Sequence, residues 1–140
     1  AVIQMVSQDD VLANLRTARL LLEQAAAAGA RLAVLPENFA AIGRRDLPQL
    51  GRAEALGEGP ILPWLHQAAR DLGLWIVAGT LPLPPDDQPE AKPHACSLLI
   101  DAQGQVAAHG LINTREHLES LFEAKQLGFS SVQQFHAAHS

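Results

Sequence analysis

The sequence predicts a protein of the α/β class, in which helices cover a β-sheet. Short continuous apolar runs alternate with stretches whose apolar residues recur at helical spacing, in the order β-α-β-α-β-β. Strands that alternate with helices in this way build layered α/β folds. The chain has 140 residues, of which 48% are hydrophobic and 18% charged, and this suits one domain with a substantial core.

Two longer helices are predicted from their apolar stripes. The first spans residues 11–28, can be capped by Asp9 or Asp10, and carries Asn14 on its polar side. The second spans residues 60–72. We expect both helices to pack on the same face of one sheet.

Five short runs of apolar residues predict the strands of that sheet. The last two flank a glycine-containing turn that is typical of a β-hairpin. Between the elements, residues 47–55 predict a short helix, and the proline-rich residues 82–89 predict a loop. The strands are predicted near residues 1–6, 31–36, 74–80, 95–100 and 105–108.

Charge and composition argue against several classes of protein. A net charge of −5 does not fit a nucleic-acid-binding protein, which needs a basic face. No apolar run approaches the roughly 20 residues of a membrane-spanning helix. The chain begins without a basic leader and a long apolar segment, so no secretory signal is expected. A single cysteine, Cys96, rules out an internal disulfide and fits the reducing cytoplasm.

Glu37 is the first candidate functional residue. It follows the apolar run 32–35 and Pro36, so it lies at the carboxyl end of a predicted strand, where open α/β sheets bind their ligands. A carboxylate so close to a core needs partners or a shifted pKa. We therefore expect Glu37 to lie in a recess, more buried than an ordinary glutamate, and to act as a general base. The alternative is an ordinary loop or helix-capping acid.

The sequence around Glu37 resembles the amino-terminal part of the nitrilase superfamily, the carbon–nitrogen hydrolases. The resemblance is carried by Leu-Pro-Glu-Asn-Phe at 35–39, Gly-Glu-Gly-Pro at 57–60 and Ala-Gly-Thr-Leu-Pro at 78–82, in this order and spacing. These motifs are most similar to the amidase branch, the enzymes of deaminated-glutathione and ω-amidase type. The resemblance covers about residues 1–108. Residues 109–140 form a divergent tail that predicts two amphipathic helices.

The resemblance implies a fold and a chemistry. Members of the family fold as a four-layer αββα sandwich and hydrolyse amides or nitriles with a glutamate, a lysine and a cysteine, without a cofactor or a metal. The glutamate is the general base, the lysine stabilises the oxyanion, and the cysteine becomes acylated. Glu37 matches the glutamate by motif. Asn38 and Phe39 beside it are candidates to bind a small amide substrate.

The lysine and the cysteine of the family have no match in this chain. The strand at 105–108 leads to Leu111, which lies about where the lysine is expected, and the cysteine is expected beyond Ser140. Cys96 is predicted to be a small buried apolar residue, and Lys125 a solvated charge. We therefore expect a partial αββα sandwich, truncated and inactive when alone.

Two functions are compatible with this prediction, and a third is less so. The chain is the amino-terminal half of an amide hydrolase, or it is a noncatalytic remnant or assembly module that keeps part of the fold. A nucleotide-binding α/β domain would need a phosphate motif, and residues 57–59 lack the third glycine of a dinucleotide fingerprint. A sandwich also buries the second face of its sheet, so we expect self-association or coverage by the tail. The tail residues available for this are Leu118, Leu121, Phe122 and Phe135.

Overall fold

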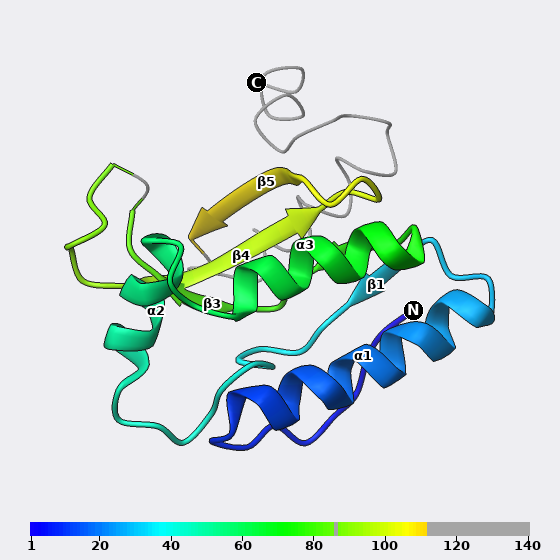
Figure 1. Cartoon of the computed structure of the whole chain (residues 1–140), viewed down its shortest axis with the longest axis horizontal. Coiled ribbons are helices and arrows are strands. Elements are labelled where there is room, and N and C mark those ends of the chain that lie inside the picture. The colour runs from blue at the N-terminus through cyan, green and yellow to red at the C-terminus, as the bar shows by residue number, and fades with distance from the viewer. Residues whose placement is uncertain (86, 112–140) are drawn as a thin grey trace.

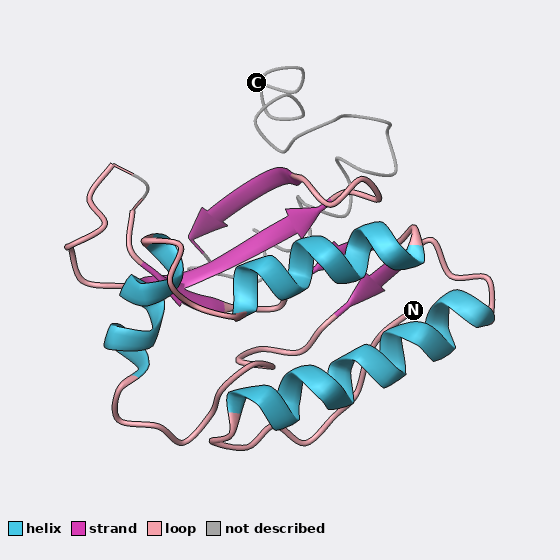
Figure 2. Ribbon diagram, viewed as in Figure 1, coloured by secondary structure: helices cyan, strands magenta, loops and turns pink. Residues whose placement is uncertain are grey.

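The computed structural model describes residues 1–85 and 87–111, which form three helices and a five-stranded mixed sheet (Figures 1 and 2). The predicted α/β class is confirmed, whereas the two helices predicted in the tail lie outside the described residues. In chain order the elements are α1 (Val11–Ala27), β1 (Leu32–Val34), α2 (Leu47–Ala55), α3 (Ile61–Leu72), β2 (Trp75–Val77), β3 (Leu81–Leu83), β4 (His94–Ile100) and β5 (Val106–Leu111).

The long strand β4 organises the sheet. β1 pairs with β2 in parallel, and β2, β3 and β5 each pair with β4 in antiparallel orientation. β5 pairs with β4 from Cys96 to Ile100, a stretch that overlaps the residues that pair with β2 and with β3. Because a strand has only two edges, β2 and β3 must share the edge of β4 that lies opposite β5.

The three helices match their predicted ranges to within a residue. Asp10 is the residue that caps α1, since its carboxylate accepts a hydrogen bond of 3.0 Å from the Ala13 amide. Gly73 ends α3 in a left-handed conformation, with φ of 61°. These boundaries were predictable because caps and glycine stops are local features of the sequence.

One strand prediction and part of one loop prediction are wrong. Residues 1–6 form no strand: Val2 makes a single parallel bridge to Val34, and both Val2 and Val6 are exposed. A longer ladder would need a longer partner, and β1 has only three residues. Pro82, predicted in a loop, lies within β3 and is paired with Ala95. Proline is compatible with this place because β3 is a short strand at an edge of the described sheet.

Helices α1 and α3 lie side by side on one face of the sheet, as predicted (Figure 1). Their buried residues form one core with those of β1, β2 and β4, and the largest of these side chains include Leu22, Leu65, Ile76 and Ile100. The described residues therefore form a mixed sheet with a layer of helices on one face.

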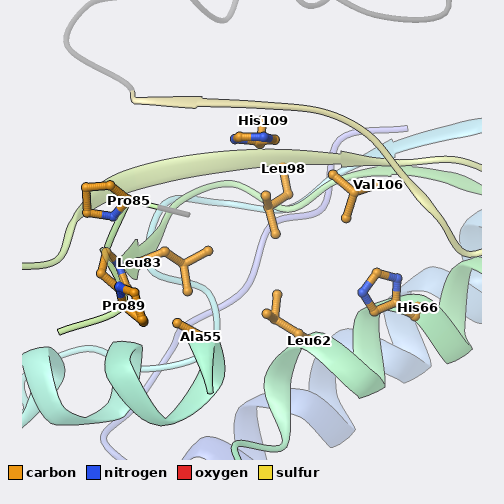
Figure 3. Close-up of a pocket in the computed structure, with 10 residues that line it drawn as sticks. Ala55, Leu62, His66, Leu83, Pro85, Pro89, Leu98, Val106 and His109 are labelled. Atoms are coloured by element: carbon orange, nitrogen blue, oxygen red, sulfur yellow. The ribbon is translucent and has the colours of Figure 1, made fainter. Parts of the chain in front are cut away.

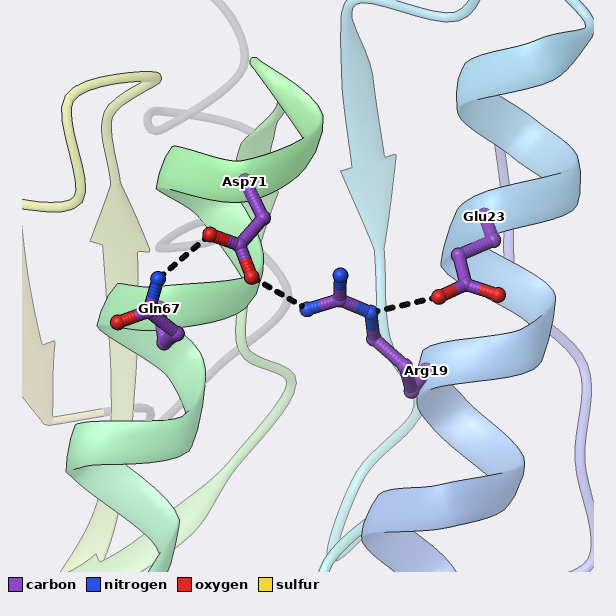
Figure 4. Close-up of polar contacts among 4 residues, drawn as sticks. All are labelled: Arg19, Glu23, Gln67 and Asp71. Carbon is purple, nitrogen blue, oxygen red and sulfur yellow. Dashed lines mark hydrogen bonds and ion pairs between the residues drawn. The ribbon is translucent and has the colours of Figure 1, made fainter.

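A surface ion-pair network also joins α1 and α3 (Figure 4). Arg19 donates to Glu23 at 2.9 Å and to Asp71 at 3.1 Å, and Gln67 donates to the other oxygen of Asp71. The side chains of Arg19, Glu23 and Asp71 are 30%, 46% and 38% exposed, and ion pairs in contact with solvent contribute little to the free energy of unfolding. The apolar core holds the two helices on the sheet.

None of the helices in the described part of the chain combines the length and the apolar character that a membrane crossing requires.

Candidate active site

Glu37 lies just past the end of β1, beside the turn that links β2 to β3. The Leu35 amide donates to the Val77 carbonyl at 2.9 Å, and beyond Pro36 the backbone of Glu37 bridges that of Thr80 in parallel. Glu37 therefore stands at the carboxyl ends of two parallel strands, as the sequence predicts.

The β2–β3 turn passes very close to the backbone before Glu37. Gly79 has φ of 56°, and a Cβ atom at this position would lie 2.0 Å from the Pro36 carbonyl oxygen. Any side chain would therefore push the two segments apart and strain the backbone. Because Gly79 of the Ala-Gly-Thr motif has no side chain, the backbone of Pro36 and Glu37 can lie directly against the turn.

Asn38 continues this contact in an uncommon conformation. Its φ of 51° makes it the one non-glycine residue in the described chain with a left-handed backbone, which asparagine tolerates better than most residues. The Asn38 amide donates to the Thr80 hydroxyl at 3.1 Å, and that hydroxyl lies 3.5 Å from Asn38 Oδ1. These contacts give Asn38 a structural role. Its contact with substrate stays a prediction.

Phe39 fixes the segment 37–38 to the hydrophobic core. Its ring is fully buried and lies 6.0 Å from the ring of Trp64 on α3, and its carbonyl accepts a 2.9 Å hydrogen bond from the Ser7 hydroxyl. The side chain therefore belongs to the core between the helices and the sheet. Its contact with substrate also stays a prediction.

Asn14 supports the same segment and was assigned by the sequence to the wrong side of its helix. Its side chain is buried, and its amide donates to the carbonyls of Gln8 and Ala40 at 2.8 Å each. Its oxygen accepts from the Gln8 amide at 2.9 Å. The signal was available: Asn14 lies four residues before the buried Ala18, which places both on one helical face.

The side chain of Glu37 is exposed, so the prediction that it is more buried than an ordinary glutamate is wrong. Within the described residues its carboxylate makes no hydrogen bond or ion pair, so it is sterically open to a reacting group.

The described residues do not assemble the other two groups that the family's chemistry uses. Cys96, at 8% exposure, lies in β4 as part of the main core, which confirms its predicted burial. Leu111, at the position where the lysine was expected, is paired with Cys96 at the end of β5. Lys125 lies outside the described residues.

A separate cavity of about 470 Å³ lies between α2, α3 and strands β3, β4 and β5 (Figure 3). Apolar side chains such as Leu62, Leu83 and Leu98 line it, with His66 and His109 beside them. Glu37 does not line this cavity, which is therefore not the candidate active site. The described residues hold no group of three or more metal-ligating side chains.

Replacing Thr80 with valine tests how the segment 37–38 is held. We expect Thr80→Val to lower the free energy of unfolding by about 1–3 kcal/mol, because the partly buried Asn38 amide loses its acceptor while the volume is kept. Thr80→Ser keeps the hydroxyl and is expected to retain most of the stability. Urea unfolding measures both variants, and a valine variant as stable as the original chain would contradict the contact.

The profile of the carbon-nitrogen hydrolase family matches residues 1–132. The chain therefore belongs to this family, within the nitrilase superfamily, and carries its amino-terminal portion.

Known proteins similar to this chain support the assignment. Human deaminated glutathione amidase is 37% identical over 109 residues, which are 77% of this chain and 33% of that protein. Among solved structures, the C. elegans NitFhit protein has a TM-score of 0.66 and 25% identity over 79% of this chain and 26% of that one. An amidase from Nesterenkonia sp., with a TM-score of 0.61, 24% identity and coverage of 79% and 40%, shares the fold.

A shorter segment of the chain is similar to a protein that is not named as an amidase. The methylamine utilization protein MauD of Paracoccus versutus is 58% identical over 41 residues, which are 29% of this chain and 21% of that protein. The chain thus spans about a third of the amidases and about a fifth of the MauD proteins that it matches.

Proposed function

We propose that residues 1–108 supply the amino-terminal half of a carbon–nitrogen hydrolase for small amides, with Glu37 as its general base. The observation that carries this proposal is the position of Glu37. Its motif matches the family, it stands at the carboxyl ends of β1 and β2, and its carboxylate is open to a reacting group. The similarity to deaminated glutathione amidase supports an amide as the substrate class.

The proposed half needs a complement before it can act. A general base removes a proton, but acyl transfer also needs a nucleophile and a group that stabilises the oxyanion. The chain has Leu111 where the lysine is expected, and its one cysteine is buried in the core of β4. The described residues therefore supply Glu37 with neither a lysine at the expected position nor an exposed cysteine.

We also propose that the chain is composite, with the hydrolase part at residues 1–108 and a separate tail at 109–140. The amidases match over 109 residues, which are 77% of the chain. The similarity to MauD, a protein of another name, supports a second origin for part of the chain. The family profile reaches further, to residue 132. Sequence beyond residue 108 in close homologues of this chain would show whether the tail varies independently.

Complementation tests the proposed activity. We expect co-expression with the remaining part of human deaminated glutathione amidase, lysine and cysteine included, to give a complex that hydrolyses small ω-amides. Glu37→Gln should reduce this activity to background because the amide cannot accept a proton. The matched control is Glu58→Gln, which removes another exposed carboxylate in the loop before α3.

The outcomes separate the two functions. A complex that forms and hydrolyses amides equally well with Glu37→Gln would contradict the role of Glu37. A complex that forms without activity would favour the noncatalytic assembly module, the alternative supported by the missing lysine and cysteine. Co-purification of the two polypeptides establishes whether the complex has formed.

A further inference from the structure

The cavity between α2, α3 and strands β3, β4 and β5 has walls that three close contacts hold in place. α2 lies directly against β3, because a Cβ atom at Gly51 would collide with the Pro82 carbonyl. The Glu54 carboxylate joins α2 to α3, since it accepts hydrogen bonds from the first two amides of α3. His66 Nδ1 joins α3 to the β4–β5 turn, at 2.6 Å from the Gly104 carbonyl oxygen. The cavity is therefore preformed, as ligand pockets usually are.

The size and the lining of this cavity suit a small apolar molecule. Its volume of about 470 Å³ falls within the range of about 300–1,000 Å³ that is typical of ligand pockets. An adjoining hollow of about 370 Å³ shares Leu98 and His109 and extends the space toward Gly110. Val106, in the wall of the cavity, is 44% exposed (Figure 3). An apolar occupant that covers this wall removes nonpolar surface from water, which favours binding.

The lining also indicates that the ligand is neutral. The described residues that line the cavity include no carboxylate, lysine or arginine side chain. A charged ligand would lose its hydration there without gaining an ion pair, and this is costly. An aromatic ring, by contrast, buries a large apolar area and has few internal rotations to lose on binding.

His66 supplies a directional polar contact. A carbonyl oxygen only accepts hydrogen bonds, so the Nδ1 atom beside the Gly104 carbonyl carries the proton. In the neutral imidazole the second nitrogen, Nε2, is then a hydrogen-bond acceptor. Leu62 and His66 are four residues apart on α3, and both side chains line the cavity (Figure 3). The ligand group that matches Nε2 is a hydrogen-bond donor.

We propose that this cavity binds a small neutral aromatic molecule with a hydroxyl donor, of the phenol class. The hydroxyl donates to His66 Nε2, and the ring lies among Leu62, Leu83 and Leu98. Glu37 does not line the cavity, so this inference is independent of the proposed function. The bound molecule contacts α2, α3 and the β4–β5 hairpin together, and thereby stabilises the folded chain.

Two probes that differ in one group test this site. 2-Naphthol carries a hydroxyl donor, whereas 2-methoxynaphthalene has the same ring system and can only accept a hydrogen bond. We expect 2-naphthol to bind the full chain saturably, and about 2–10-fold more tightly than 2-methoxynaphthalene, as one hydrogen bond allows. An NMR titration of the labelled chain measures both affinities. Nuclear Overhauser effects from the bound ring to the methyl groups of Leu62, Leu83 and Leu98 locate the site.

Two substitutions separate the apolar and the polar contributions. Ala55→Phe should weaken the binding of both probes by an order of magnitude or more, because Ala55 is an exposed residue at the edge of the cavity. Gln49→Phe, its matched control, adds the same ring at an exposed position of α2 outside the lining. His66→Phe keeps a ring but removes the acceptor, so the preference for 2-naphthol should disappear. His94→Phe, at an exposed position of β4, should preserve that preference.

Several results would overturn the proposal. They are the lack of saturable binding of 2-naphthol, equal affinities of the two probes, and a preference that His66→Phe leaves unchanged. Binding that Gln49→Phe weakens as much as Ala55→Phe would also contradict the location. If Ala55→Phe prevents folding, the Overhauser effects in the original chain decide the location. Effects that leave out the three leucines would place the probe elsewhere and refute the site.

Discussion

Purified alone, the chain is expected to hydrolyse small ω-amides at no more than the background rate. Glu37 supplies a base, but neither a matched nucleophile nor a matched oxyanion-stabilising lysine is present. Loss of a single oxyanion donor typically lowers the rate by about 10²–10³. Loss of the nucleophile removes the covalent route altogether. Ammonia release from a small ω-amide, followed against a blank without protein, measures the result.

Cys96 is the one thiol that could rescue activity, and its environment argues against it. It lies in the core of β4 at 8% exposure, opposite Leu81 of β3. A buried thiol in apolar surroundings has little thiolate character. The prediction would be wrong if the chain showed turnover that both Glu37→Gln and Cys96→Ala abolish. Such a result would identify Cys96 as the nucleophile, provided that the control Glu58→Gln stays active.

The sequence predicts the helices better than the strands, for a physical reason. The bounds of α2 match the predicted residues 47–55, because helices depend on contacts within a few residues. Strands depend on partners far along the chain. Residues 1–6 have the composition of a strand, but their only pairing with β1 in the described chain is the bridge between Val2 and Val34. Conversely, β3 includes Pro82 because the edge of β4 is available to pair with it.

The candidate site shows the same division between local and distant causes. The position of Glu37 at a strand end was predictable, because Pro36 and the preceding apolar run are local signals. Its exposure was not, since burial depends on which distant segments close over the strand ends. The fit of Gly79 against Pro36, and the support of Asn38 by Thr80, also arise only when residues about 40 apart meet.

Glu54→Ala is expected to lower the free energy of unfolding by about 2–4 kcal/mol, because one buried and one partly buried backbone amide lose a charged acceptor. Glu54 is 3% exposed, and its two carboxylate oxygens accept hydrogen bonds from the amides of Ile61 at 2.7 Å and Leu62 at 2.8 Å. Glu54 thereby caps the amino-terminal end of α3, where the first amides have no acceptor within the helix. Gly59 makes room for it, since a Cβ atom there would lie 2.1 Å from the carboxylate.

The pH dependence separates the charge of Glu54 from its hydrogen bonds. Burial raises the pKa of Glu54 above the ordinary value of 4.5, and outweighs the two amide donors that lower it. A raised pKa in the folded state means that the stability from this group is fully present below 4.5 and is lost as the pH rises through the folded value.

Glu54→Gln removes this titration while it keeps one oxygen acceptor, so it should cost less than Glu54→Ala. Urea unfolding over a range of pH is expected to show that the advantage of the original chain over Glu54→Gln shrinks as the pH rises. The pKa of Asp46 is lowered by Arg44, and that of Asp71 by Gln67, so both groups lose stability in the opposite direction, as the pH falls. Both remain in the variant and cancel in the difference. Parallel pH profiles of the two proteins would therefore contradict a raised pKa at Glu54.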